Sequence, residues 1–188
     1  VYDKYCSYSN EKLFGYDASR GANVDYDFCG DGEDNDKDTF IDFNDKDCNT
    51  FNLQVPSITP NPVSEGGLIS VSCPFQPTVK GSLITFNQNG RPGVEVYIEG
   101  QKCSSPVSWN GNTATLQNCN VGSGSASKQV ECQALQEGVT KSSKFSTVNI
   151  QLQTCAQKGG VQCGLGQICA QTVASSDNPN CCISCKQD

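Results

Sequence analysis

The chain has 188 residues, of which 36% are hydrophobic, and a formal net charge of −7; it has 13 cysteines but no histidine and no methionine. Without histidine there can be no Ser-His-Asp triad, no Cys-His nucleophile pair and no imidazole-bound zinc. No apolar run approaches the roughly 18 residues of a membrane-spanning helix. Because no basic patch is present to neutralise phosphates, nucleic acid is not an expected partner.

The N-terminal segment, residues 1–24, is rich in aromatic side chains and poor in aliphatic ones. Its opening residues lack the basic-then-apolar pattern of a secretion signal, so we expect a mature chain. The aromatic side chains are those of Tyr2, Tyr5, Tyr8, Phe14 and Tyr16. An arm of this composition cannot form its own core, and tyrosine and phenylalanine are favoured interface anchors. The arm is therefore expected to dock, either on its own chain or on a strand edge of another copy.

The second segment, residues 25–50, contains nearly all of the charge imbalance. Ten acids and two lysines lie between Asp25 and Asp47, so this stretch has a charge of −8 and the remainder is near +1. Such crowding without cations would be self-repulsive, which favours a bound cation over a solvated acidic run. Both interpretations remain open from the residues alone.

The spacing of these acids matches a 12-residue calcium loop, which takes oxygen ligands from positions 1, 3, 5, 7, 9 and 12. Counted from Asp34, the ligands are Asp34, Asp36, Asp38, the Phe40 carbonyl, Asp42 and Asp45. Asp31, Glu33 and Asp47 are left over and could help to hold a second calcium ion. Two positions depart from the pattern: Thr39 stands where a glycine normally turns the chain, and Asp45 replaces a longer glutamate. We expect one Ca²⁺, with residues for a second, bound with a dissociation constant on the order of 10⁻⁴–10⁻³ M.

The third segment, residues 51–154, alternates apolar and polar residues as half-buried strands do. The alternation is clearest over 69–73, 94–99, 130–134 and 148–152. About seven short strands in this length predict a mainly β fold, an immunoglobulin-like β-sandwich, with a small barrel as the alternative. Two disulfides are expected here. One joins the inward-facing Cys73 and Cys132 across the sheets, and the other joins Cys103 and Cys119 around Trp109.

The last segment, residues 155–188, is too short to bury much core and is expected to be held together by disulfides. Its six cysteines are Cys155, Cys163, Cys169, Cys181, Cys182 and Cys185. They allow 15 pairings, and the adjacent Cys181 and Cys182 are expected to bond elsewhere rather than to each other. The sequence leaves open whether this module is a rigid spacer or a small binding knot.

The thirteen cysteines are spread along the chain, as is typical of disulfides that close loops. Only Cys182 and Cys185 have the Cys-x-x-Cys spacing of a zinc knuckle, so disulfides and an extracellular, oxidising setting are predicted. Cys29 and Cys48 are included among the expected disulfide cysteines. Because thirteen is odd, one thiol is free, or a two-fold bond joins two copies, or the chain continues beyond Asp188.

Three stretches of the chain resemble known families. The acidic run between Cys29 and Cys48 resembles Cys-flanked calcium repeats of secreted prokaryotic proteins, which are similar to thrombospondin type 3 repeats. The sequences around Cys73, Trp109 and Cys132 resemble immunoglobulin-like modules of archaeal surface proteins, and the tail resembles a Cys-rich module that accompanies them. The resemblance implies an extracellular cell-surface or appendage protein without known catalytic residues.

The leading functional prediction is a non-enzymatic structural subunit of a calcium-stabilised surface filament, with copies of itself as partners. The alternative is a calcium-dependent adhesin or carbohydrate-binding module that uses Tyr97, Trp109 and Arg91. An enzyme is the least expected class. Glu95 and Glu99 share an expected strand face with Glu131 nearby, but nothing marks them out from solvent-facing residues.

Overall fold

The computed structural model describes residues 12–17, 22–27, 32, 39–44, 51–79, 82–178 and 180–187. Over these residues the protein is mainly β, with several sheets and no α-helix. Within the same ranges, no helix is long and apolar enough to cross a membrane. The coarse prediction of a β protein with a disulfide-rich C-terminal region is therefore confirmed.

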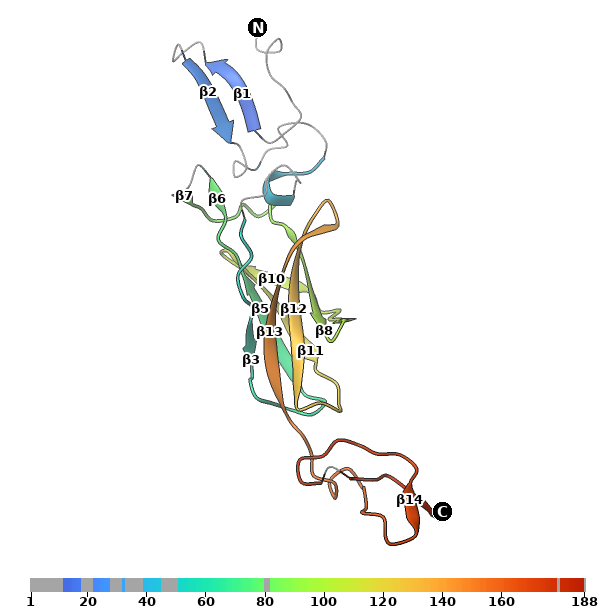
Figure 1. Cartoon of the computed structure of the whole chain (residues 1–188). Helices are drawn as coiled ribbons and strands as arrows, with labels where there is room; N and C mark the ends of the chain where they lie inside the picture. The colour runs from blue at the N-terminus through green and yellow to red at the C-terminus, as the bar shows by residue number, and fades with distance from the viewer. Residues whose placement is uncertain are drawn as a thin grey trace.

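A two-stranded hairpin lies at the start of the described chain (Figure 1). Strand β1 (Lys12–Asp17) pairs antiparallel with β2 (Ala22–Asp27), so that Phe14 lies opposite Asp25. The sequence predicts an aromatic arm over residues 1–24 and an acidic calcium-binding segment over residues 25–50, with a boundary after residue 24. The hairpin places that boundary inside a strand. Tyr2, Tyr5 and Tyr8 lie outside the described residues.

Two larger sheets form the body of the protein (Figure 1). The first has the order β10-β11-β5-β3, all antiparallel neighbours. Its strands are β10 (Val107–Asn110), β11 (Thr113–Asn120), β5 (Leu68–Pro74) and β3 (Ser57–Thr59). The second has the order β4-β13-β12-β8-β9, in which β4 and β13 run parallel. Its strands are β4 (Val63–Ser64), β13 (Val139–Gln151), β12 (Ser127–Gln136), β8 (Gly93–Ile98) and β9 (Gln101–Lys102). A short hairpin of β6 (Thr78–Val79) and β7 (Ser82–Leu83) lies beside them.

The inner faces of the two large sheets form one hydrophobic core. Val71 of the first sheet and Val96, Val130 and Val148 of the second are fully buried, as the period-two alternation predicted. A disulfide between Cys73 of β5 and Cys132 of β12 joins the sheets through this core, and the predicted Cys103–Cys119 bond also forms.

The predicted alternation extends one residue too far at β8. The strand ends at Ile98, and Glu99 lies in the following turn with a φ of +49°. Gly100 continues this turn with a φ of +76°, a conformation that glycine adopts without steric cost. Glu95 and Glu99 therefore do not share a strand face, and the expectation that they do is wrong.

The C-terminal region is held by three disulfides and a two-stranded sheet of β14 (Gln167–Cys169) and β15 (Cys185–Gln187). The bonds are Cys155–Cys181, Cys163–Cys185 and Cys169–Cys182. Cys181 and Cys182 thus bond elsewhere, as predicted. Both are buried, so cystine sulfur fills the interior that a larger domain would fill with aliphatic side chains.

Gly160 is required by this packing. A Cβ atom at residue 160 would lie 2.4 Å from the Cys181 Sγ and 2.8 Å from the Cys155 Sγ, closer than carbon and sulfur can approach. The described chain thus contains five disulfides, which is typical of proteins from oxidising environments. Cys6, Cys29 and Cys48 lie outside the described residues.

Candidate functional site

Most of the predicted calcium ligands lie outside the described residues. This applies to Asp31, Asp34, Asp36, Asp38, Asp45 and Asp47. Of the proposed set, the structure places Phe40 and the backbone of Asp42, which begins a short 3₁₀ turn, η1 (Asp42–Asn44). The calcium site therefore stays a prediction. Within the predicted loop, the structure describes only residues 39–44.

Thr39, the position at which a calcium loop normally has glycine, adopts a left-handed backbone conformation. Its φ is +83°, which L-residues rarely adopt and which costs a β-branched residue of order 1–3 kcal/mol. The chain therefore makes the turn that the loop pattern requires at position 6, although the residue is threonine. Residue 39 therefore departs from the calcium-loop pattern in its residue type but not in its backbone conformation.

We expect Thr39→Gly to raise the free energy of unfolding by about 1 kcal/mol, because glycine adopts a positive φ without the Cβ clash. Thermal unfolding measured with and without calcium checks this. Thr147, an exposed residue of β13, provides the matched control, because Thr147→Gly should instead destabilise by a similar amount. A loss of stability in both variants would show that the turn at residue 39 is not strained.

Phe43 fastens the end of the acidic loop to the sandwich. Its side chain is fully buried, and its ring lies 5.1 Å from that of Phe86 in an edge-on contact. The Phe43 N–H donates to the Gly90 carbonyl at 3.0 Å, and Gln136 Nε2 donates to the Phe43 carbonyl at 3.3 Å. The spacing of the acids does not predict this anchor, because it concerns only the metal ligands; an aromatic residue within an acidic stretch is the signal that the sequence offers.

Trp109 belongs to the same aromatic cluster. Its ring lies 5.6 Å from both Phe75 and Phe86, and the Arg91 guanidinium lies 5.3 Å above it. The half-buried tryptophan is thus packed against the core rather than projecting from the surface. Tyr97 lies on β8 of the other sheet, so the structure does not bring the three predicted ligand-binding residues into one site.

Tyr97 is instead part of a small polar group on the five-stranded sheet. Its hydroxyl donates to Glu95 Oε2 at 2.6 Å, and Lys102 forms an ion pair with the same carboxylate. The hydrogen bond from Lys102, followed by that from Tyr97, lowers the pKa of Glu95, and the bond to Glu95 raises the pKa of Tyr97. A carboxylate held in its charged form by two donors is a poor general acid, which does not favour the carboxylate pair considered for an enzyme.

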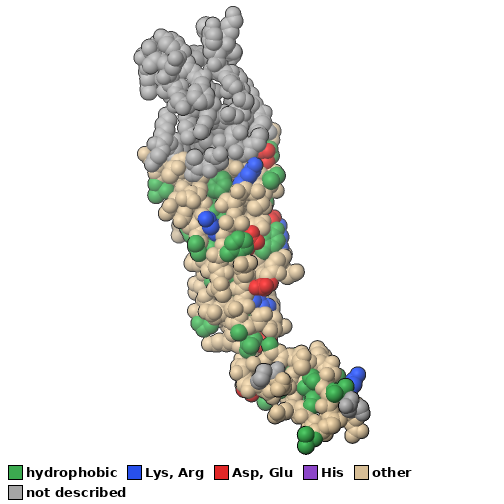
Figure 2. Space-filling model, viewed as in Figure 1, with side chains coloured by type: hydrophobic (Ala, Val, Ile, Leu, Met, Phe, Trp, Pro, Cys, Tyr) green, Lys and Arg blue, Asp and Glu red, His purple; other side chains and the backbone are tan. Residues whose placement is uncertain are grey.

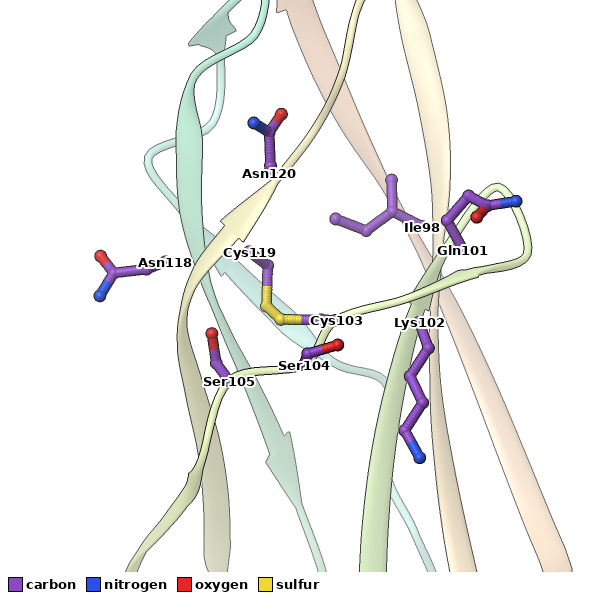
Figure 3. Close-up of a pocket in the computed structure, with 9 residues that line it drawn as sticks. All are labelled: Ile98, Gln101, Lys102, Cys103, Ser104, Ser105, Asn118, Cys119 and Asn120. Carbon is purple, nitrogen blue, oxygen red and sulfur yellow. A yellow bond between two sulfur atoms is a disulfide. The ribbon is translucent and has the colours of Figure 1, made fainter.

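A pocket of about 350 Å³ lies over the Cys103–Cys119 disulfide. Figure 3 shows Ser105 and Asn118 to one side of this bond and Gln101 and Lys102 to the other. Ser104 and Asn120 complete its polar lining, in which Lys102 is the only charged side chain. Nothing in the sequence marked these residues except the predicted disulfide beneath them.

Glu65 forms the junction between the sandwich and the C-terminal region. Its carboxylate accepts hydrogen bonds from the backbone N–H of Gly124 at 2.9 Å and of Gln153 at 3.4 Å, and from the Lys158 ammonium at 2.7 Å. The side chains of Glu65 and Lys158 are only 6% and 12% exposed. Burial alone would raise the pKa of Glu65, but its hydrogen bonds and the charge on Lys158 together lower it. The carboxylate is thus held ionised at the point where the two parts meet.

Three cysteine sulfurs of the C-terminal region form a close cluster. The Sγ atoms of Cys163, Cys169 and Cys182 lie within 4.8 Å of one another. Each is bonded in a disulfide, and Cys182 and Cys185 have different partners. The cluster therefore offers no thiolate to a metal, and the Cys-x-x-Cys spacing does not mark a zinc knuckle here.

No protein-family model matches this chain, and a search of curated proteins finds no match either. The chain is thus described by its own features, as a Cys-rich, disulfide-bonded, mainly β protein.

Proposed function

We propose that the chain is a structural subunit of an extracellular filament or surface layer, built on an immunoglobulin-like sandwich and stabilised by calcium. The observation that carries this proposal is the way in which two disulfide-bonded parts follow one another (Figure 1) and are joined by the partly buried Glu65–Lys158 ion pair. A hydrogen-bonded ion pair between two disulfide-bonded parts suits a protein that bears load. It is not needed by a module that only presents a binding loop.

The sheet orders support the immunoglobulin-like assignment. In such domains strands A, B, E and D form one sheet and strands C, F and G the other, and a disulfide joins strands B and F. The orders β3-β5-β11-β10 and β13-β12-β8 fit these roles, and the Cys73–Cys132 bond then joins the B and F strands. Trp109 lies on β10, away from the strand that holds the core tryptophan of antibody domains.

Calcium is proposed to stiffen the acidic segment that leads into the sandwich. Two observations support this. Thr39 makes the turn that a calcium loop needs, and Phe43 fixes the loop's end to the core. With calcium bound, the loop would be held both by the metal and by the packing of Phe43. Without calcium, the repulsion among the aspartates would act against an ordered loop.

Electron microscopy of the full chain with millimolar calcium tests the proposal. We expect filaments or sheets for the full chain, and disassembly or softening when a chelator removes calcium. We expect no assembly after deletion of residues 1–19, which removes the predicted aromatic anchors and strand β1 of the N-terminal hairpin. Filaments that persist without residues 1–19 would contradict docking by the arm. Indifference to the chelator would contradict the calcium joint.

The pocket over Cys103–Cys119 favours one second candidate, a binding module for polyhydroxylated ligands such as glycans. Amide and hydroxyl groups like those of Asn118, Asn120 and Ser105 are suitable partners for sugar hydroxyls. A glycan array of the monomeric protein separates the candidates. A purely structural subunit should bind nothing, and binding that Ser105→Ala weakens would favour the module.

A further inference from the structure

Strand β13 has one edge that is uncovered over much of its length. On one side β13 pairs with β12 as far as Asn149. On the other side the two-residue strand β4 covers only Ile150 and Gln151. Among the described residues, no strand pairs with this second edge between residues 140 and 146. An open edge of this length is a template for strand addition.

The side chain of Asn61 shows which backbone groups face the open edge. Its Nδ2 donates to the Thr147 carbonyl at 3.1 Å, and its Oδ1 accepts from the Asn149 N–H at 2.9 Å, as a neighbouring strand would. In an antiparallel ladder, alternate residues direct both backbone groups to the same side. Ser143 and Phe145 therefore direct their N–H and C=O groups to the open edge, beyond the reach of Asn61.

The surface at this edge is basic and partly apolar. Lys141 and Lys144 are exposed, and neither takes part in an ion pair among the described residues. Val139 and Phe145 are 59% and 47% exposed, large fractions for apolar side chains. A complementary partner would be an extended segment with both acidic and apolar residues.

The N-terminal hairpin contains such a segment. Strand β2 has the sequence Ala-Asn-Val-Asp-Tyr-Asp, with two carboxylates beside valine and tyrosine. We infer that the open edge of β13 accepts strand β2 of a second copy, which extends the five-stranded sheet by the hairpin of its neighbour. This inference rests on the proposed function and names the contact through which the subunits assemble.

Charge favours this partner over a second β13 strand. Pairing two copies of β13 at their open edges would bring Lys141 and Lys144 of both chains together, and like charges across a strand pair are destabilising. Pairing with β2 would instead bring Asp25 and Asp27 near the two lysines, so that the negative and positive charges offset each other.

A charge exchange tests the contact. We expect the double variant Lys141→Glu, Lys144→Glu to raise the critical concentration for assembly about tenfold, and the added changes Asp25→Lys, Asp27→Lys to return it to within about twofold of the original. Lys186→Glu, which changes a lysine of β15, is the control and should leave the critical concentration unchanged. An unchanged critical concentration in the double variant, or no recovery in the fourfold variant, would overturn the inference.

A photo-crosslinking residue at Phe145 identifies the partner directly. We expect intermolecular crosslinks that map to residues 22–27. Crosslinks that map to β13, or that form only within one chain, would overturn the inference while assembly itself stands. If the unaltered chain does not assemble in calcium, the proposed function fails together with the contact.

Discussion

Replacing Cys73 and Cys132 together by alanine is expected to lower the free energy of unfolding by about 4 kcal/mol. The bond closes a loop with a sequence separation of 59 residues, and in the chain-entropy model a disulfide stabilises more as the loop it closes grows. Both cysteines are fully buried, so the change also removes packing from the centre of the core. Urea unfolding followed by the fluorescence of Trp109, the single tryptophan, measures the loss.

The matched control is the double alanine variant of Cys103 and Cys119, whose sequence separation is 16 residues. The same model assigns this bond about 3 kcal/mol, so the core variant should be the less stable of the two by about 1 kcal/mol. An equal or larger loss in the control would show that loop length does not govern the effect of these bonds.

Glu65→Gln is expected to cost about 2 kcal/mol, because it leaves the partly buried ammonium of Lys158 without its counter-charge. The loss of stability should be greatest where the sandwich meets the C-terminal region. Hydrogen exchange of the Gly124 and Gln153 amides, which bond to Glu65, should become faster there. Glu131→Gln is the control: Glu131 accepts one hydrogen bond, from Gln133, which glutamine can still accept, so stability should change by less than about 0.5 kcal/mol.

The same variant has a defined pH dependence. The folded pKa of Glu65 lies below its ordinary value of 4.5, so the ionised carboxylate contributes stability that is complete above pH 4.5 and is lost as the pH falls through the folded pKa. The stability difference between the original chain and Glu65→Gln should therefore shrink below pH 4.5. A constant difference from neutral to acidic pH would show that the carboxylate acts through shape and not through charge.

The strands of the sandwich could be predicted because burial on one face leaves a period of two in the sequence. Val71, Cys73, Val130 and Cys132 show this, and the bond between the two cysteines followed from their inward-facing positions. The pairing of the C-terminal cysteines could not be predicted, since six cysteines allow 15 arrangements and nothing local distinguishes them. The end of β8 was misplaced because alternation contains no stop signal apart from Gly100.

The contacts that join the parts were not predictable for a different reason. Glu65 lies in a turn with two glycines, and its partner Lys158 is 93 residues away, so no local pattern connects them. Phe43 lies within the acidic run, where the spacing of aspartates dominated the interpretation. Contacts of this kind arise from tertiary packing, which a periodic pattern in one segment does not encode.

The attachments at the two ends of β13 determine how the protein would respond to tension. Just before it, the Glu137 N–H donates to the Asn44 carbonyl at 3.0 Å, which ties the strand's start to the end of η1. Just after it, the chain reaches Gln153, which is bonded to Glu65. Tension applied between these two attachment points would act along β13. It would place the hydrogen-bonded ladder between β13 and β12 under shear. The backbone hydrogen bonds of that ladder would share the force at once instead of opening one after another.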